Sequence, residues 1–235
     1  METLTLEDGI FTLTLPIAFN VDNINKLETL IAEVEDYPSP TALILTSKHP
    51  KIFNAGMDTK SIMENGLSSA IQIGEALMKF AARLMNLNCP TIACINGHAI
   101  AAGFMIASCT DYKIKRSEFG YIQLNEILNG IITATGPNQI LRATLHPSVH
   151  RDMLLRGIRY ETEMALKEGI VDEAYEGSIL MQMCILKAKE MINEQFEAKN
   201  FIVEVRKEKL SNAIVLCQKG EFDKDFVTEM LNPKI

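Results

Sequence analysis

Glu126 is the only charged residue in the stretch IQLNEILNGI, which runs from Ile122 to Ile131. A single acidic residue in an apolar stretch most often reaches solvent at a turn, and that interpretation fits this segment. A carboxylate enclosed by apolar neighbours behaves differently, because desolvation raises its pKa toward the range in which it can accept and return a proton. Glu126 is therefore either a surface residue or an acid–base catalyst.

Two glycine-containing stretches could supply hydrogen-bond donors to such a catalyst. They are FNAGMD, from Phe53 to Asp58, and NGHAIAAGFMIA, from Asn96 to Ala107. Taken separately, the first is explained by a tight turn at Gly56 and the second by a turn and a closely packed helix. Taken together, they could form an oxyanion hole, since small residues at a helix start let a ligand approach free backbone N–H groups. Losing one such donor typically costs about 3–4 kcal/mol of transition-state stabilisation.

Strand-like and helix-like patterns alternate along most of the chain. Period-two alternation or a short apolar run predicts strands at 9–15, 41–47, 91–97, 112–122 and 169–175. Apolar residues at helical spacing predict helices around 24–34, at 68–87 and at 99–109. Residues 48–58 are expected to form a loop, and only helical patterns follow Gly177. This order predicts a layered α/β fold with an appended helical region.

The composition is that of an ordinary globular protein. The chain has 235 residues, of which 47% are apolar and 23% are charged. The net charge of −7 gives no support for a nucleic-acid surface, which needs clustered Lys and Arg. The apolar runs are too short to span a bilayer, and the acidic start METLTLEDGIF is unlike a presequence. We expect no nucleic-acid partner, no membrane span and no secretion.

The cysteines and histidines show no pattern typical of a metal site. The five cysteines are odd in number, lack a C-x-x-C pair, and three of them lie in or beside apolar stretches. His49, His146 and His150 show no ligand spacing. We expect a reducing compartment, no disulfide framework and no bound metal.

Four motifs in order resemble the crotonase, or enoyl-CoA hydratase/isomerase, superfamily. IFNAGMD is similar to its F-x-A-G-x-D stretch, and CPTIACINGHAIAAGFMIASCTDYKI to its P-x-I-A-x-(I/V)-N-G-x-A-x-G-G-G stretch. FGYIQLNEILNGI, followed by GP, and ALKEGIVDEAY match two further segments, so the likeness covers about residues 8–175. The motifs are closest to those of monofunctional 3,2-trans-enoyl-CoA isomerases.

The resemblance implies a spiral of repeated strand–strand–helix units, with a core at 1–176 and a C-terminal helical oligomerisation region at 177–235. It implies a homotrimer, or a hexamer made from two trimers. The compartment expected from the resemblance is the cytoplasm or the peroxisomal matrix. The final PKI is only distantly like a peroxisomal address, so it does not separate these two.

The resemblance also implies an acyl-CoA thioester substrate, with no cofactor apart from the coenzyme A of that substrate. It places the oxyanion-hole N–H groups on Met57 and Ala102, and Ala102 stands where the family usually has Gly. The other substrate-binding positions that it implies are Ala55, Gly56, Asp58, Lys60, Gly103 and Met105. Met63, Met78, Met85 and Met105 are expected to fill the core or an acyl tunnel, because Met adapts to irregular gaps. We expect structural roles for His98 and Asp111.

The side chain at position 105 separates the possible reactions. Hydratases of this family use two glutamates, and their positions fall on Met105 and Glu126 here. A chain that lacks one carboxylate should hydrate poorly, since a positioned acid–base group contributes about 10²–10⁴-fold. Moving a double bond needs one base, so isomerisation of a 3-enoyl-CoA by Glu126 is the favoured prediction. Enoyl-CoA hydration, thioester hydrolysis and catalytically silent acyl-CoA binding stay open as alternatives.

Overall fold

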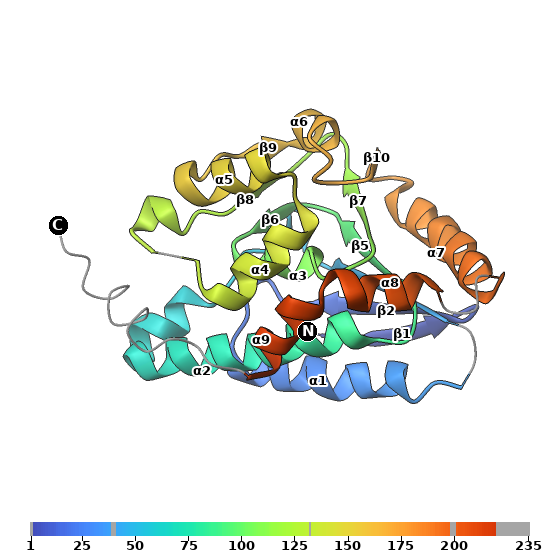
Figure 1. Ribbon diagram of the computed structural model, residues 1–235, viewed down its shortest axis with the longest axis horizontal. Coiled ribbons are helices and arrows are strands. Elements are labelled where there is room, and N and C mark those ends of the chain that lie inside the picture. Colours follow the sequence, from blue (N-terminus) through green and yellow to red (C-terminus); the bar gives the residue numbers. More distant parts are fainter. Residues whose placement is uncertain (1, 39–40, 132, 198–200, 220–235) are drawn as a thin grey trace.

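Three successive segments of the chain repeat the order strand, strand, helix. The computed structural model, shown in Figure 1, describes residues 2–38, 41–131, 133–197 and 201–219. The first segment contains β3 (Ala42–Ser47), β4 (Ile52–Asn54) and α2 (Thr59–Asn86). The second contains β5 (Thr91–Ile95), β6 (His98–Ile100) and α3 (Ala102–Ala107). The third contains β7 (Tyr112–Arg116), β8 (Tyr121–Gln123), the 3₁₀ helix η1 (Ile127–Asn129) and α4 (Thr135–Thr144). The predicted α/β spiral is confirmed.

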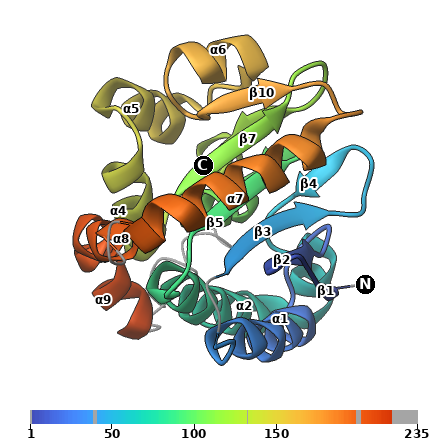
Figure 2. The same cartoon turned by 90° about the vertical axis from the view of Figure 1, so that its right-hand side faces the viewer.

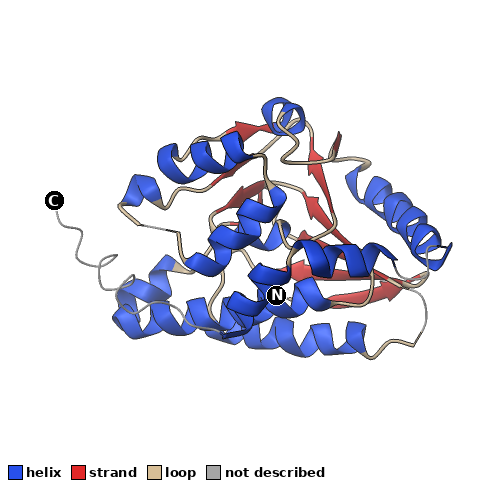
Figure 3. Cartoon of the chain, in the orientation of Figure 1, coloured by secondary structure: helices blue, strands red, loops and turns tan. Residues whose placement is uncertain are grey.

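The two strands of each segment enter different sheets. The six-stranded sheet has the order β1-β2-β3-β5-β7-β10, and its remaining members are β1 (Leu4–Glu7), β2 (Ile10–Leu15) and β10 (Glu173–Tyr175). The four-stranded sheet has the order β4-β6-β8-β9, ending in β9 (Tyr160–Glu161). Figure 3 shows the strands in red, enclosed by helices. Because β4, β6 and β8 are neighbours and parallel, their carboxyl ends point the same way.

Glycines let the corners between paired strands approach closely. Gly97 joins β5 to β6, and a Cβ there would lie 2.3 Å from the carbonyl carbon of Lys51, between β3 and β4. A Cβ at Gly120, before β8, would lie 2.7 Å from the carbonyl carbon of Gly97. Neither distance leaves room for a side chain, so the stacking of the three corners requires glycine at both positions.

The first helix matches its prediction and the second is longer than predicted. In α1 (Val21–Glu35), Asn20 accepts a hydrogen bond from the backbone N–H of Asn23 at 2.9 Å, which caps the helix. Helix α2 begins at Thr59, ahead of the predicted start, because the carboxylate of Asp58 caps it. Gly66 then interrupts it with φ of 69°. Met63 lies in the added part and is 86% exposed, so its predicted burial was wrong.

Hydrophobic periodicity did not predict the short strands or several of the connecting helices. The segment 48–58, expected to be a loop, contains β4, and β6 lies within the predicted small-residue helix, which is confined to α3. Helices α5 (Pro147–Arg156) and α6 (Thr162–Lys167) were not predicted. The predicted strand 112–122 is divided into β7 and β8.

The C-terminal region is helical, as predicted, and packs on two faces of the core. Its described helices are α7 (Leu180–Glu197), α8 (Phe201–Lys209) and α9 (Ser211–Lys219), and the PKI tail lies outside the described residues. Figure 2 shows α7 lying across β3, β5 and β7. Helix α9 packs against α2 and α4, on the other side of the sheet from α7. No described helix is long and apolar enough to cross a membrane.

Arg206 attaches α8 to the core. Its side chain is 4% exposed, and its Nη1 donates to Asp111 Oδ2 at 2.5 Å, so Asp111 has the structural role expected for it. The same guanidinium donates to the carbonyl oxygens of Met85, Leu87 and Cys89, at the end of α2 and just beyond it. These contacts satisfy carbonyl groups that the end of a helix leaves without intrahelical partners.

We expect Arg206→Ala to lower the free energy of unfolding by about 3–5 kcal/mol, because it leaves a buried carboxylate and several carbonyl groups without their partner. Chemical denaturation measures the change. The matched control is Lys207→Ala, which removes a partly exposed side chain with one solvent-exposed hydrogen bond, to Asn88, and should cost less than about 1 kcal/mol. Equal losses in the two variants would contradict the structural role of Arg206.

Candidate active site

The three residues predicted to carry chemistry follow the ends of three neighbouring strands. Met57 follows β4, Ala102 follows β6 and Glu126 follows β8. Ligands of parallel sheets bind at the carboxyl ends of the strands, where the following loops meet. All three residues line one cavity. The fold therefore brings together Met57 and Glu126, which are 69 residues apart in the sequence.

Asn54, at the end of β4, fixes the loop that carries Met57. Its side chain is fully buried, donates to the carbonyl oxygen of Pro16 at 2.9 Å and accepts from the N–H of Gly56 at 2.8 Å. The chain beyond it is held by hydrogen bonds on both sides of Met57, from Phe19 to Gly56 and from Asp58 to Phe19, each at 2.8 Å. Among the described residues, the Met57 N–H itself has no hydrogen-bond acceptor.

The start of α3 packs directly on this loop. A Cβ at Gly103 would lie 2.3 Å from the carbonyl oxygen of Asn54, so the close approach requires glycine. A Cβ at Gly56 would lie 3.5 Å from the backbone nitrogen of Ala102. The Ala102 N–H is the first of the helix and donates to no residue in the described ranges. The two free N–H groups thus belong to loops in contact, and both residues line the cavity.

Glu126 lies in a turn that is fixed by its own carbonyl oxygen. That oxygen accepts hydrogen bonds from the N–H groups of Asn129 and Ile131, both at 2.9 Å. Gly130 ends the short 3₁₀ helix in the left-handed conformation. These bonds hold the backbone of the turn and leave the carboxylate free to face the cavity.

The side chain of Glu126 is partly buried, mainly among apolar residues. Its Oε2 is buried, and the described residues offer it no hydrogen-bond partner. Burial raises the pKa of Glu126, and its own backbone N–H offsets part of the rise. A raised pKa combined with an unpaired oxygen is typical of a group that exchanges protons with a ligand.

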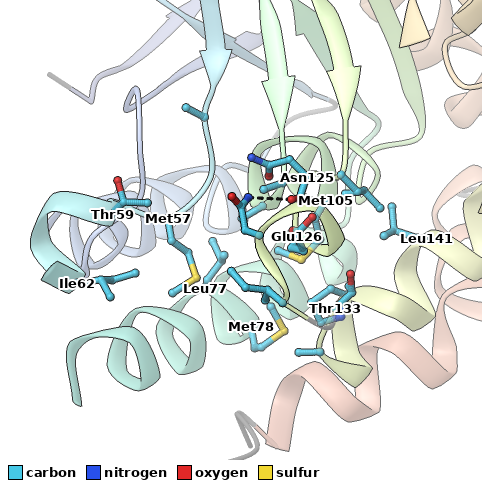
Figure 4. A pocket seen from close by; sticks show the side chains of 18 residues that line it. Met57, Thr59, Ile62, Leu77, Met78, Met105, Asn125, Glu126, Thr133 and Leu141 are labelled. Atoms are coloured by element: carbon cyan, nitrogen blue, oxygen red, sulfur yellow. Dashed lines mark hydrogen bonds between the residues drawn. The ribbon is translucent and has the colours of Figure 1, made fainter. Parts of the chain in front are cut away.

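The cavity has a volume of about 190 Å³ and is largely apolar. Figure 4 shows Glu126 beside Met105, with Leu77 and Met78 of α2 on the facing wall. Glu126 is the only ionisable side chain among the 18 lining residues, all of which lie in the described part of the chain. The described residues also contain no group of three or more His, Cys, Asp or Glu side chains that could hold a metal ion.

The other predicted substrate-binding residues are divided between the cavity and its supports. Ala55 and Met105 line the cavity, and Met105 is 2% exposed. Gly56 and Gly103 form the contact between the two donor loops. Asp58 caps α2 by accepting from the backbone of Lys60 at 3.1 Å. Lys60 is exposed, lies 3.9 Å from a Glu64 oxygen and does not line the cavity.

Sequence analysis missed most of the apolar wall and all of the polar mouth. The missed lining residues are Thr59, Ile62, Leu77, Ala101, Leu124, Asn125, Asn129, Ile131, Thr133, Ala134, Pro137 and Leu141. Asn129 donates to the carbonyl oxygen of Asn125 at 2.9 Å, the dashed line in Figure 4. The polar residues next to Glu126 in sequence were a usable signal, whereas α4 contributes wall residues that no motif marks.

Ala101 adopts a backbone conformation that alanine rarely takes. It connects β6 to α3 with φ of 50° and ψ of −124°, a region that costs a residue with a Cβ about 1–3 kcal/mol. Its N–H donates to the carbonyl oxygen of Gln123 at 2.9 Å, which ties the turn to β8. The turn that presents the Ala102 N–H is therefore strained and held by its neighbours.

We expect Ala101→Gly to raise the free energy of unfolding by about 1 kcal/mol, because relief of the strain exceeds the added entropy of the unfolded chain. Thermal and chemical unfolding measure the change. Ala107→Gly is the control, since Ala107 is buried at the helical end of α3 and its loss should destabilise. Destabilisation by Ala101→Gly would contradict the strain.

Comparison with known proteins identifies the family of this chain. A family model described as enoyl-CoA hydratase/isomerase matches residues 12–233. The chain belongs to this family. The enoyl-CoA hydratase/isomerase family is part of the crotonase superfamily, so the resemblance seen in the sequence is confirmed.

Relatives of this enoyl-CoA hydratase/isomerase family member have different reaction names. The chain is 28% identical over 181 residues to "Enoyl-CoA delta isomerase 1, peroxisomal" of Arabidopsis thaliana, covering 74% of this chain and 75% of that protein. It is also 28% identical over 184 residues to "Carnitinyl-CoA dehydratase" of Citrobacter koseri, covering 77% and 70%. A crystal structure of a probable enoyl-CoA hydratase from Mycobacterium tuberculosis superposes with a TM-score of 0.85 at 20% identity, covering 98% and 96% of the two chains.

Proposed function

We propose that this family member is an enoyl-CoA isomerase that moves the double bond of a 3-enoyl-CoA to the 2-trans position. The observation that carries the proposal is the single ionisable side chain, Glu126, in a cavity whose lining includes two residues with free backbone N–H groups, Met57 and Ala102. A reaction in which one base removes a proton and returns it elsewhere on the same substrate needs these parts and no others.

The proposed reaction has two proton transfers. The Glu126 carboxylate takes a proton from C2 of the 3-enoyl thioester, and the electron pair moves onto the thioester oxygen to give a dienolate. The N–H groups of Met57 and Ala102 donate to that oxygen as its negative charge develops. The carboxylic acid then delivers its proton to C4, and the electrons return to form the C2–C3 double bond. No water and no other reactant is consumed.

The residue at position 105 favours isomerisation over hydration. Met105 lies beside Glu126 in the cavity wall, where a hydratase of this family would have its second glutamate. A thioether accepts hydrogen bonds weakly and cannot transfer a proton, so it does not position a water molecule for attack at C3. Hydration of crotonyl-CoA at a rate equal to isomerisation would favour the alternative, an enoyl-CoA hydratase.

The proposal extends to the coenzyme A end of the substrate and to assembly. Lys60 is exposed next to Thr59, which lines the cavity, and is proposed to contact a coenzyme A phosphate. A homotrimer, or a hexamer of two trimers, remains our proposal for the assembly, and light scattering tests it. The cytoplasm or the peroxisomal matrix is the proposed compartment, and one relative named above is peroxisomal by name.

We expect Glu126→Gln to lower kcat/KM for a 3-enoyl-CoA by about 10²–10⁴-fold, because the amide cannot accept the C2 proton. The increase in ultraviolet absorbance of the conjugated 2-enoyl thioester measures turnover. The matched control, Glu163→Gln, changes an exposed glutamate of α6 and should leave the rate unchanged.

A folding defect would not explain the loss. Since burial raises the pKa of Glu126, the charged form is disfavoured in the folded state, and a neutral glutamine removes that penalty at neutral pH. The variant should therefore unfold at a temperature no lower than the wild type. Undiminished turnover by Glu126→Gln would end the proposed mechanism.

We expect the rate to fall on the acidic side because Glu126 must begin the reaction deprotonated. Burial raises its pKa, so the acidic midpoint of kcat/KM should lie above the value of about 4.3 usual for glutamate. Stopped assays across pH 4 to 8 measure the midpoint. A rate that stays constant down to the ordinary glutamate value would contradict the assignment of Glu126 as the base.

A further inference from the structure

The cavity has a polar mouth and an apolar interior. Exposed or partly exposed residues at the mouth include Thr59, Asn125 and Asn129. The buried lining residues are all apolar, namely Ile62, Leu77, Met78, Met105, Leu124, Pro137 and Leu141. An acyl thioester would therefore have its coenzyme A at the mouth and its hydrocarbon end inside, where apolar burial is favourable.

Met78 forms part of this interior wall and packs against α4 and α9. Its side chain is 3% exposed, and its Sδ lies 3.8 Å from the Sγ of Cys217, a fully buried residue of α9. A Cβ at Gly136 of α4 would lie 3.0 Å from the same Sδ and 3.2 Å from the Cys217 Sγ. Methionine normally adapts its shape to a ligand. Here Gly136 of α4 and Cys217 of α9 lie against its sulfur, which restricts the directions in which the side chain can move.

The cavity volume sets the scale of the acyl group that fits in front of Met78. An apolar protein cavity of about 150 Å³ holds a six-carbon ring. By the same measure, the volume of about 190 Å³ holds about eight carbons.

We propose that Met78 ends the acyl site and limits this protein to short- and medium-chain thioesters of up to about eight carbons. The substrate class rests on the proposed function, but the length limit is a property of the cavity and can be measured without turnover. Helix α9 takes part through Cys217, so the C-terminal helical region shapes the acyl site as well as any assembly.

The test measures Kd by calorimetry for the saturated thioesters hexanoyl-, octanoyl-, decanoyl- and dodecanoyl-CoA. Each methylene that enters an apolar site should improve Kd by about fourfold. For the wild type, affinity should increase up to octanoyl-CoA and then stay constant or decrease. Met78→Ala opens the space in front of Cys217 and Gly136, so its gain should continue to decanoyl-CoA and give about tenfold tighter binding than the wild type for that ligand.

Two further variants separate the limit from general damage to the core. Gly136→Ala adds a methyl group behind Met78 and should move the optimum toward hexanoyl-CoA, so it tests the limit even if Met78→Ala does not fold. Met85→Ala is the control, since Met85 is buried on the same helix and does not line the cavity. It should keep the wild-type length profile.

The outcomes distinguish this inference from the proposed function. A wild-type affinity that rises without interruption to dodecanoyl-CoA, or identical length profiles for wild type and both Met78→Ala and Gly136→Ala, would overturn the length limit. The expected binding profiles combined with no turnover of any 3-enoyl-CoA would overturn the isomerase and leave the length limit supported. A matching shift in kcat/KM for 3-hexenoyl- to 3-dodecenoyl-CoA would support both.

Discussion

The site depends on the parallel alignment of three short strands. β4, β6 and β8 have only three residues each, but they are neighbours in one sheet and end on the same side. Each strand delivers one part, namely the two free amides and the carboxylate. The first strand of each segment belongs to the six-stranded sheet, and that sheet therefore fixes where the following short strand begins. Gly97 lets the turn between β5 and β6 pack directly against the backbone of Lys51, so the turns stack in the same order as the strands.

The apolar surroundings of the cavity affect both the carboxylate and the two backbone amides. An apolar wall raises the pKa of Glu126, which makes it a better proton acceptor once it is ionised. In the proposed mechanism, the same largely apolar surroundings strengthen the hydrogen bonds that the amides of Met57 and Ala102 would donate to the developing charge. The strained turn at Ala101 belongs to this arrangement, because its neighbours hold it in place while it presents the second amide.

Sequence patterns predicted the long elements well and the short ones poorly. The stripe of Ile24, Leu27, Ile31 and Val34 determines α1, since each residue is buried as its spacing requires. Strands β4 and β6 are too short for an alternating pattern, and their pairing depends on contacts across the sheet. Asp58 caps α2, so that helix begins ahead of its predicted start. In the site, Glu126 was predicted as the only charge of an apolar stretch, and Met57 and Ala102 from the family motifs. Leu141 and the contact of Cys217 with Met78 arise only from packing.

In the repeated segments, the residues that form the scaffold differ from the residues whose side chains line the cavity. Met105 lies on α3, and its side chain takes no part in the pairing of β4, β6 and β8. A different side chain at this position would therefore change the cavity wall and leave the strand register intact. For a protein built in this way, similarity averaged over the whole chain measures shared architecture, and the identity of one or two wall residues carries the information about chemistry.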